Sequence, residues 1–192
     1  MSELDIALEL AKLHSIRGVE FVRQLKMLTN LSIFKPVENE KDIFAAEASH
    51  RDDWPFLLDG ARKAVAHGNK VYILPNPKGT KTADYIFENK GVYKLYDLKT
   101  ITGKVSLGNR LVESVDQTNR VLVNVCTTNN PRLMASQIKN YFDANPLAVE
   151  VLIYKGKKAI SVTRRFTENP LYMFLFRQKY MQCESRPFGW LF

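Results

Sequence analysis

The chain has 192 residues, of which 45% are hydrophobic and 11% aromatic. This composition can supply a packed core, so it excludes a largely disordered chain, and the length suits one ordinary domain. The formal net charge is +8, with a sequence pI of about 9.5. A polyanionic partner such as nucleic acid would explain that excess, and solubility alone is the other explanation.

The sequence carries no signal for export or for a membrane. Cys126 and Cys183 are its only cysteines, too few for a disulfide framework and not spaced for zinc. The segment Met1 to Leu13 lacks the basic start of a secretory signal. No run approaches the roughly 18 apolar residues that a membrane span needs. We therefore expect no membrane span and a cytoplasmic site of action.

The N-terminal 40 residues are predicted to form a helical segment separate from the main domain. Apolar residues recur at helical spacing over 4–15 and 19–28, and the pattern breaks in a loop over 29–41. The main domain is expected over 41–182. The apolar tail over 183–192 either packs back onto the domain or binds a partner.

The main domain alternates helices and strands. A helix over 54–66 precedes strands over 71–74, 83–87 and 92–100, then a helix over 105–117 and a strand over 120–125. Further elements follow: a helix over 131–142, strands over 149–154 and 159–162, and a helix over 171–181. A helix that crosses between the third and fourth strands requires a parallel pairing. The sequence thus predicts an α/β (α+β) fold, a mixed four- to six-stranded sheet flanked by helices.

Two carboxylates and a lysine stand on adjacent predicted strands. Asp84 begins one strand, and Asp97 and Lys99 end the next. Side chains alternate along a strand, so Asp97 and Lys99 point to the same face. Such a pair is often only a charge pair on a wet face. Here, however, Asp97 and Lys99 interrupt an apolar strand, and the neighbouring strand supplies Asp84.

This trio suits phosphodiester hydrolysis. Two carboxylates, helped by a main-chain carbonyl, can hold Mg²⁺, Mn²⁺ or Zn²⁺. The cation lowers the pKa of a bound water and offsets charge on the phosphate. A neighbouring lysine can orient that water or contact the phosphate. Asp84 and Asp97 are therefore the candidate metal ligands, and Lys99 is the candidate catalytic lysine.

The run from about Trp54 to Val125 resembles the PD-(D/E)xK nuclease superfamily, whose core has the restriction-endonuclease-like order αβββαβ. Asp84 stands where the family has its first acid, after Ala83 instead of the usual proline, and Asp97-Leu98-Lys99 matches (D/E)xK. More narrowly, LPNPKGTKTADYIF and LYDLKT resemble nuclease toxin domains of contact-dependent inhibition proteins and some phage minor head proteins. Several of those cleave tRNA. The resemblance implies an endonuclease, delivered within a larger toxin or phage protein and bound by an acidic immunity protein.

The family often adds an acid from the first helix of its core. Glu47 is the first candidate for that role and Asp59 the second, and a surface carboxylate is the alternative for both. Gln117 ends the crossover helix, where it either contacts a phosphate or the metal-bound water, or caps the helix.

Basic residues near the motif are candidates for contact with nucleic acid. The first group flanks the motif strands and the second follows the last hairpin, where solvated turns are the alternative: Lys78, Lys81, Lys104 and Arg110, then Lys155, Lys157, Lys158, Arg164 and Arg165.

We expect a metal-dependent nuclease acting on RNA or DNA. Two other readings stay open. One is a metal-independent ribonuclease toxin that uses Lys99, Thr100 and Arg110. The other is a nucleic-acid-binding or phage structural module without catalysis.

Overall fold

The computed structural model describes residues 3–13, 16, 18–46, 52–76, 82–103, 107–115 and 117–183. In chain order its elements are α1 (Glu3–Leu13), α2 (Gly18–Thr29), β1 (Phe34–Pro36), β2 (Ile43–Ala46), α3 (Trp54–Ala66), β3 (Lys70–Ile73), β4 (Tyr85–Asn89), β5 (Val92–Ile101), α4 (Leu107–Glu113), β6 (Arg120–Val125), α5 (Pro131–Ala144), β7 (Glu150–Lys155), β8 (Lys158–Thr163), α6 (Arg164–Thr167) and α7 (Tyr172–Gln182). The tail over 184–192 lies outside the described residues. These elements confirm the predicted mixed α/β class.

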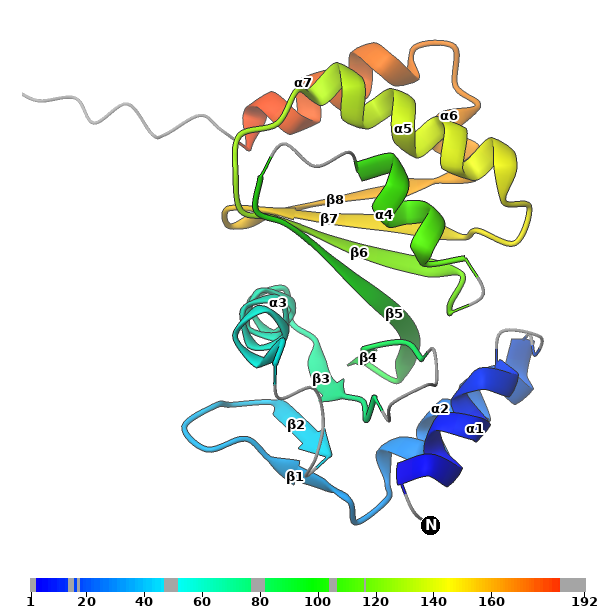
Figure 1. The fold of residues 1–192 in the computed structure, drawn as a ribbon, viewed down its shortest axis with the longest axis vertical. Helices are drawn as coiled ribbons and strands as arrows, with labels where there is room; N and C mark the ends of the chain where they lie inside the picture. Colours follow the sequence, from blue (N-terminus) through cyan, green and yellow to red (C-terminus); the bar gives the residue numbers. More distant parts are fainter. Residues whose placement is uncertain are drawn as a thin grey trace, which may run out of the picture.

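The sheet is larger than predicted. Among the described residues it has eight strands, and their order in space follows the chain from β1 to β8 (Figure 1). The expectation of four to six strands was wrong because β1 and β2 fall in and beside the stretch read as a loop. Three and four residues are too few to show alternation, and Pro36 is a residue that argues for a turn.

Strand β5 joins two halves of this sheet. Its first half pairs antiparallel with β4, from Asn89 opposite Val92 to Tyr85 opposite Tyr96. Its second half pairs parallel with β6, starting where Asp97 lies opposite Val121. The strand therefore leaves one partner and joins the other between Tyr96 and Asp97, the point where the predicted site lies.

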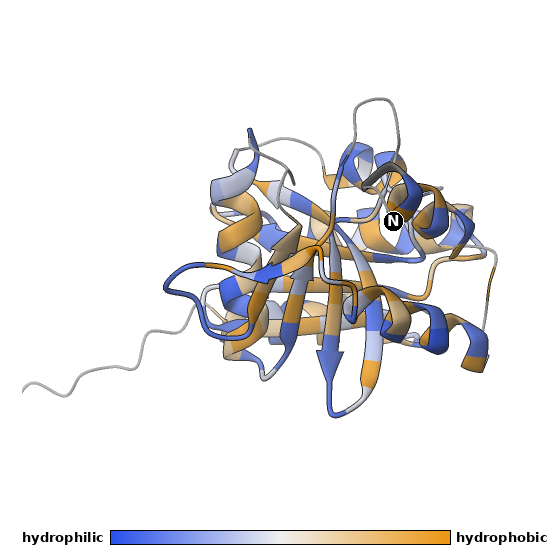
Figure 2. Cartoon of the chain, turned by 90° about the horizontal axis from the view of Figure 1, so that it is seen from below, coloured by the Kyte–Doolittle hydropathy of each residue, from blue (hydrophilic) through white to orange (hydrophobic). Residues whose placement is uncertain are grey.

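Helices cover both faces of the sheet. One face of β5–β8 packs against α4, α5 and α7, and α1 and α2 cover the same side of β4 and β5 (Figure 1). Helix α3 covers the opposite face. Strand β6 illustrates why, since Val121 and Val123 enter the first core and Leu122 enters the core under α3. Figure 2 shows hydrophobic residues, in orange, along the strands and on the helices.

Helix α3 lies unusually close to the sheet. A Cβ atom on Gly60 would come within 2.8 Å of the hydroxyl of Tyr85 and 3.5 Å of Leu98 Cδ1. The same hydroxyl donates a hydrogen bond of 2.8 Å to the carbonyl of Leu57. Glycine thus permits the approach, and the tyrosine fixes the first half of α3 over β5.

Candidate active site

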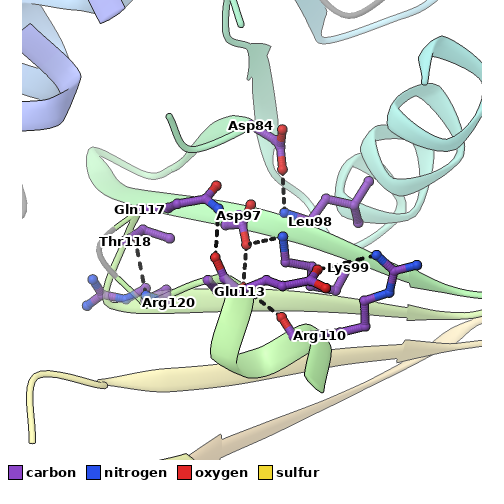
Figure 3. Close-up of polar contacts among 10 residues, drawn as sticks. Asp84, Asp97, Leu98, Lys99, Arg110, Glu113, Gln117, Thr118 and Arg120 are labelled. Atoms are coloured by element: carbon purple, nitrogen blue, oxygen red, sulfur yellow. Dashed lines mark hydrogen bonds and ion pairs between the residues drawn. The ribbon is translucent and has the colours of Figure 1, made fainter. Parts of the chain in front are cut away.

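Asp97 and Lys99 form an ion pair on one face of β5. The Lys99 Nζ lies 3.0 Å from Asp97 Oδ2, and the side chains are 13% and 3% exposed (Figure 3). The period-two alternation of the strand predicted this shared face. Burying a carboxylate this deeply is costly unless charge or hydrogen bonds compensate, and Lys99 supplies part of that compensation.

Asp84 lies immediately before β4, in the gap where β4 and β5 part. Its Oδ2 accepts a hydrogen bond of 2.6 Å from the main-chain N–H of Leu98, and its own N–H donates to the Tyr96 carbonyl at 2.9 Å (Figure 3). The carboxylate therefore takes the place of a strand partner that Leu98 no longer has. In a strand the N–H and C=O of one residue point the same way, so the Leu98 carbonyl faces this gap as well.

The two carboxylates act on each other. Removal from water, and next the negative charge of Asp97, raise the pKa of Asp84 well above its usual value. The Leu98 N–H and the charge of Lys99 oppose that shift without cancelling it. The positive charge of Lys99 therefore does not return the pKa of Asp84 to its usual value.

Ser114 is a site residue that sequence reasoning missed. It follows α4, is 0% exposed, and its hydroxyl donates a short hydrogen bond to Asp97 Oδ2. That oxygen is the one that Lys99 also contacts, so both partners lie on the same side of the carboxylate. A lone serine 17 residues from Asp97 carries no sequence signal of this contact.

Asp84, Asp97 and Lys99 line one hollow of about 440 Å³. Polar and charged residues dominate its wall: Asp53, Asn76, Thr82, Asp84, Asp97, Lys99, Thr100, Thr102, Arg110 and Gln117, with Phe56, Leu57 and Leu98 as apolar members. Arg110 reaches it from α4 while pairing with Glu113 at 3.3 Å. Gln117 donates 2.8 Å to the Glu113 carbonyl, so it caps the helix and borders the hollow at once.

Asp59, the second candidate for the additional acid, does not join the hollow. Asp59 accepts hydrogen bonds from Lys63 at 2.8 Å and Asn124 at 2.7 Å, and it does not line the hollow. Its part in holding α3 to β6 explains its place in the sequence. Glu47, Lys78, Lys81 and Lys104 lie outside the described residues.

The basic residues after the last hairpin are divided between two ends of β8. Lys157 and Lys158 lie at the turn before it, and Arg164 and Arg165 follow its other end, roughly 20 Å away for a six-residue strand. Two of them have local partners, since Lys158 donates to the Gln182 carbonyl and Arg164 to that of Asn145. These candidate nucleic-acid contacts therefore form two separate basic groups.

Three further findings concern metal ligands, membrane-spanning helices and similarity to known proteins. The described residues contain no group of three or more His, Cys, Asp or Glu side chains placed to hold a metal ion. None of the helices in the described ranges is long and apolar enough to cross a membrane. No family model matches the chain, and neither a curated protein nor a solved structure is significantly similar to it.

Proposed function

We propose that this chain is a metal-dependent nuclease that hydrolyses phosphodiester bonds in RNA or DNA. The observation that carries the proposal is the facing of Asp84 and Asp97 in a polar hollow beside Lys99. Removal from water and the negative charge of Asp97 raise the pKa of Asp84, so the ionised Asp84 carboxylate weakens the fold. Such an arrangement is typical of functional sites, where a bound cation removes the cost.

The donor set fits a hard divalent cation. Asp84, Asp97 and the carbonyl of Leu98 supply oxygen ligands, the kind that Mg²⁺ and Mn²⁺ prefer, and water commonly completes such shells. The cation would lower the pKa of a water and offset negative charge on the phosphate. Two protein carboxylates are a usual number for Mg²⁺, so the lack of a third in the described residues does not conflict with it.

The remaining charged groups suit phosphate. Lys99 lies close enough to the acid pair to hold a water or a phosphate oxygen by hydrogen bonding. Arg110 borders the same hollow, and 45% of its side chain is exposed. Its guanidinium can therefore form a bidentate pair of hydrogen bonds with a phosphate. Both groups would hold the substrate chain over the acids.

The order of elements gives the proposal independent support. Helix α3, strands β3, β4 and β5, helix α4 and strand β6 follow the αβββαβ order of the superfamily that the sequence resembles. A role as a tRNA-cleaving toxin with an acidic immunity protein rests on the sequence resemblance alone. Co-purification with a protein encoded beside it would test that part.

The test is cleavage of total tRNA and of plasmid DNA in Mg²⁺, Mn²⁺ or EDTA. We expect cleavage that requires the cation, disappears in Asp97→Asn and falls by about 100- to 1000-fold in Lys99→Met. Asp143→Asn is the matched control, because Asp143 is an exposed acid paired with Lys139 on α5. Each folded variant is checked by circular dichroism.

Two outcomes would replace the proposal. Cleavage that persists in EDTA and in Asp97→Asn would favour a metal-independent ribonuclease, for which Lys99, Thr100 and Arg110 all line the hollow. Binding of nucleic acid without any cleavage would instead leave a binding module. In either case Asp84 and Asp97 would not be metal ligands in catalysis.

A further inference from the structure

An exposed aromatic ring stands at the edge of the candidate active site. Phe56 lies in the first turn of α3, is 44% exposed and lines the same hollow as Asp84, Asp97 and Lys99. A phenylalanine left in water forgoes the free energy of burial. Its place beside the acids, in a hollow otherwise walled mainly by polar groups, gives the ring a surface on which a ligand can pack.

The backbone that carries Phe56 is held rigidly. Phe56 lies four residues before Gly60, so both are on the same face of α3, and a Cβ atom on Gly60 would meet Tyr85 and Leu98. The next residue, Leu57, is buried and its carbonyl accepts the Tyr85 hydroxyl at 2.8 Å. The position of the Phe56 backbone relative to Leu98, between the two motif residues of β5, is therefore set before any ligand binds.

Polar groups line the same hollow as the ring. Asn76 and Thr102 are exposed and offer hydrogen-bond donors and acceptors, and Arg110 adds a positive charge. A flat ring, adaptable polar groups and cationic side chains together suit a nucleotide whose base is unpaired. A base inside a duplex has both faces covered by its neighbours, so the Phe56 ring could not stack on it.

We propose that Phe56 stacks on an unpaired base next to the scissile phosphate, so that the substrate is a single-stranded segment of nucleic acid. This inference rests on the proposed nuclease function, and it adds the substrate class to it. The stacking contributes to binding of the substrate chain, whereas Asp84, Asp97 and Lys99 act at the phosphate. Loss of the ring should therefore raise KM more than it lowers kcat.

The test uses a hairpin oligonucleotide with a single-stranded 3′ tail, made as RNA and as DNA, with 2-aminopurine in the tail. The wild-type protein should cleave in the tail, leave the stem intact and quench the 2-aminopurine on binding. Phe56→Ala should raise KM by about 5- to 100-fold and lose the quenching, and Phe56→Trp should keep both near the wild-type level. Phe174→Ala is the control, because Phe174 is 58% exposed on α7 and does not line the hollow.

The outcomes separate this inference from the proposed function. Cleavage of the stem as readily as the tail, or an unchanged KM and unchanged quenching in Phe56→Ala, would overturn the stacking while leaving the nuclease in place. Quenching that depends on Phe56 without cleavage by the wild-type protein would keep the stacking and reject the nuclease. Absence of both quenching and cleavage would overturn the two together.

Discussion

The hydroxyl of Ser114 donates a hydrogen bond to the same oxygen of Asp97 that pairs with Lys99. Both donors on Oδ2 leave Oδ1 turned toward the gap that Asp84 enters. One oxygen of the carboxylate is thus held both by the residue that follows α4 and by a residue of β5. Outer partners of this kind fix metal ligands in their productive geometry.

Removal of the Ser114 hydroxyl should weaken metal binding. We expect Ser114→Ala to lower Mn²⁺ affinity, and the cleavage rate at subsaturating Mn²⁺, by about 10- to 100-fold. Isothermal titration with Mn²⁺ measures the first effect without a substrate. Ser161→Ala is the matched control, since Ser161 donates 2.7 Å to Glu150 instead of Asp97. Equal Mn²⁺ affinity in Ser114→Ala and Ser161→Ala would show that Asp97 needs no such support.

The raised pKa of Asp84 predicts how stability depends on pH without metal. Native Asp84 keeps its proton above about pH 3.9, the usual value, at which the unfolded chain releases it. Unfolding then releases a proton, so the free energy of unfolding falls as pH rises from that value through the folded pKa. The free energy of unfolding of Asp84→Asn should not fall in this way, and Mg²⁺ should prevent the fall in the wild-type protein.

Thermal unfolding at a series of pH values, in EDTA and in Mg²⁺, measures this effect. Above the folded pKa we expect Asp84→Asn to be the more stable protein in EDTA, by about 2–4 °C in Tm for each kcal/mol recovered. In Mg²⁺ the order should reverse, because the variant binds the cation poorly. Parallel wild-type and variant curves in EDTA would mean that the two carboxylates do not repel each other.

The close approach of α3 to the sheet at Gly60 predicts that the effect of Gly60→Ala on stability changes sign with the residue at position 85. Alanine usually stabilises a helix by up to about 1 kcal/mol over glycine. Here its Cβ would press on the Tyr85 hydroxyl at 2.8 Å, so we expect Gly60→Ala to destabilise the protein by about 1–2 kcal/mol. In a Tyr85→Phe background, which removes that atom, the same change should be neutral or stabilising. Urea denaturation of the four proteins gives the coupling, and additive effects would refute the contact.

The lowered pKa of Glu150 predicts a second dependence of stability on pH, opposite in direction to that of Asp84. Burial tends to raise its pKa, but hydrogen bonds from Ser161 and Tyr96 and the charge of Lys94 outweigh burial and lower it. A lowered pKa contributes stability that is present above the unfolded value and is lost as pH falls through the folded value. Glu150→Gln should therefore cost about 2 kcal/mol near neutral pH and lose less stability in acid.

Cleavage should survive this change, because Glu150 does not line the hollow of Asp84 and Asp97. Chemical denaturation between pH 2 and pH 7 compares the two proteins. An identical loss of stability in acid would place the acid-sensitive group elsewhere. A loss of cleavage in a stably folded Glu150→Gln would show coupling between the two regions.

Much of this fold could be predicted because its elements are local patterns. Helix α3 and strand β6 begin and end at the expected residues, although the Asp53 side chain at the start of α3 makes no capping hydrogen bond. The alternation of Asp97 and Lys99 followed from geometry alone. Strands β1 and β2 could not be predicted, because the pairing of β1 with β2 and of β2 with β3 comes from contacts across the chain and not from their own three or four residues.

The site was predicted where strand geometry determines it, and missed where tertiary packing does. Ser114 and Phe56 come to the acids because α4 and α3 pack on opposite faces of β5, which no spacing in the sequence reveals. Asp59 was a reasonable second candidate as an acid on the correct helix. It turns instead toward Lys63 and Asn124, because the helix face that meets the hollow is the one with Phe56 and Gly60.

The change of partner within β5 has a mechanical consequence. Asp84 belongs to the half of the sheet that includes β4, whereas Asp97 begins the pairing with β6, and β5 is the strand shared by both halves. A small rotation of one half against the other would change the separation of the two acids directly. The separation of the two carboxylates therefore depends on the angle between the halves, and an ion bound to both would hold that angle fixed.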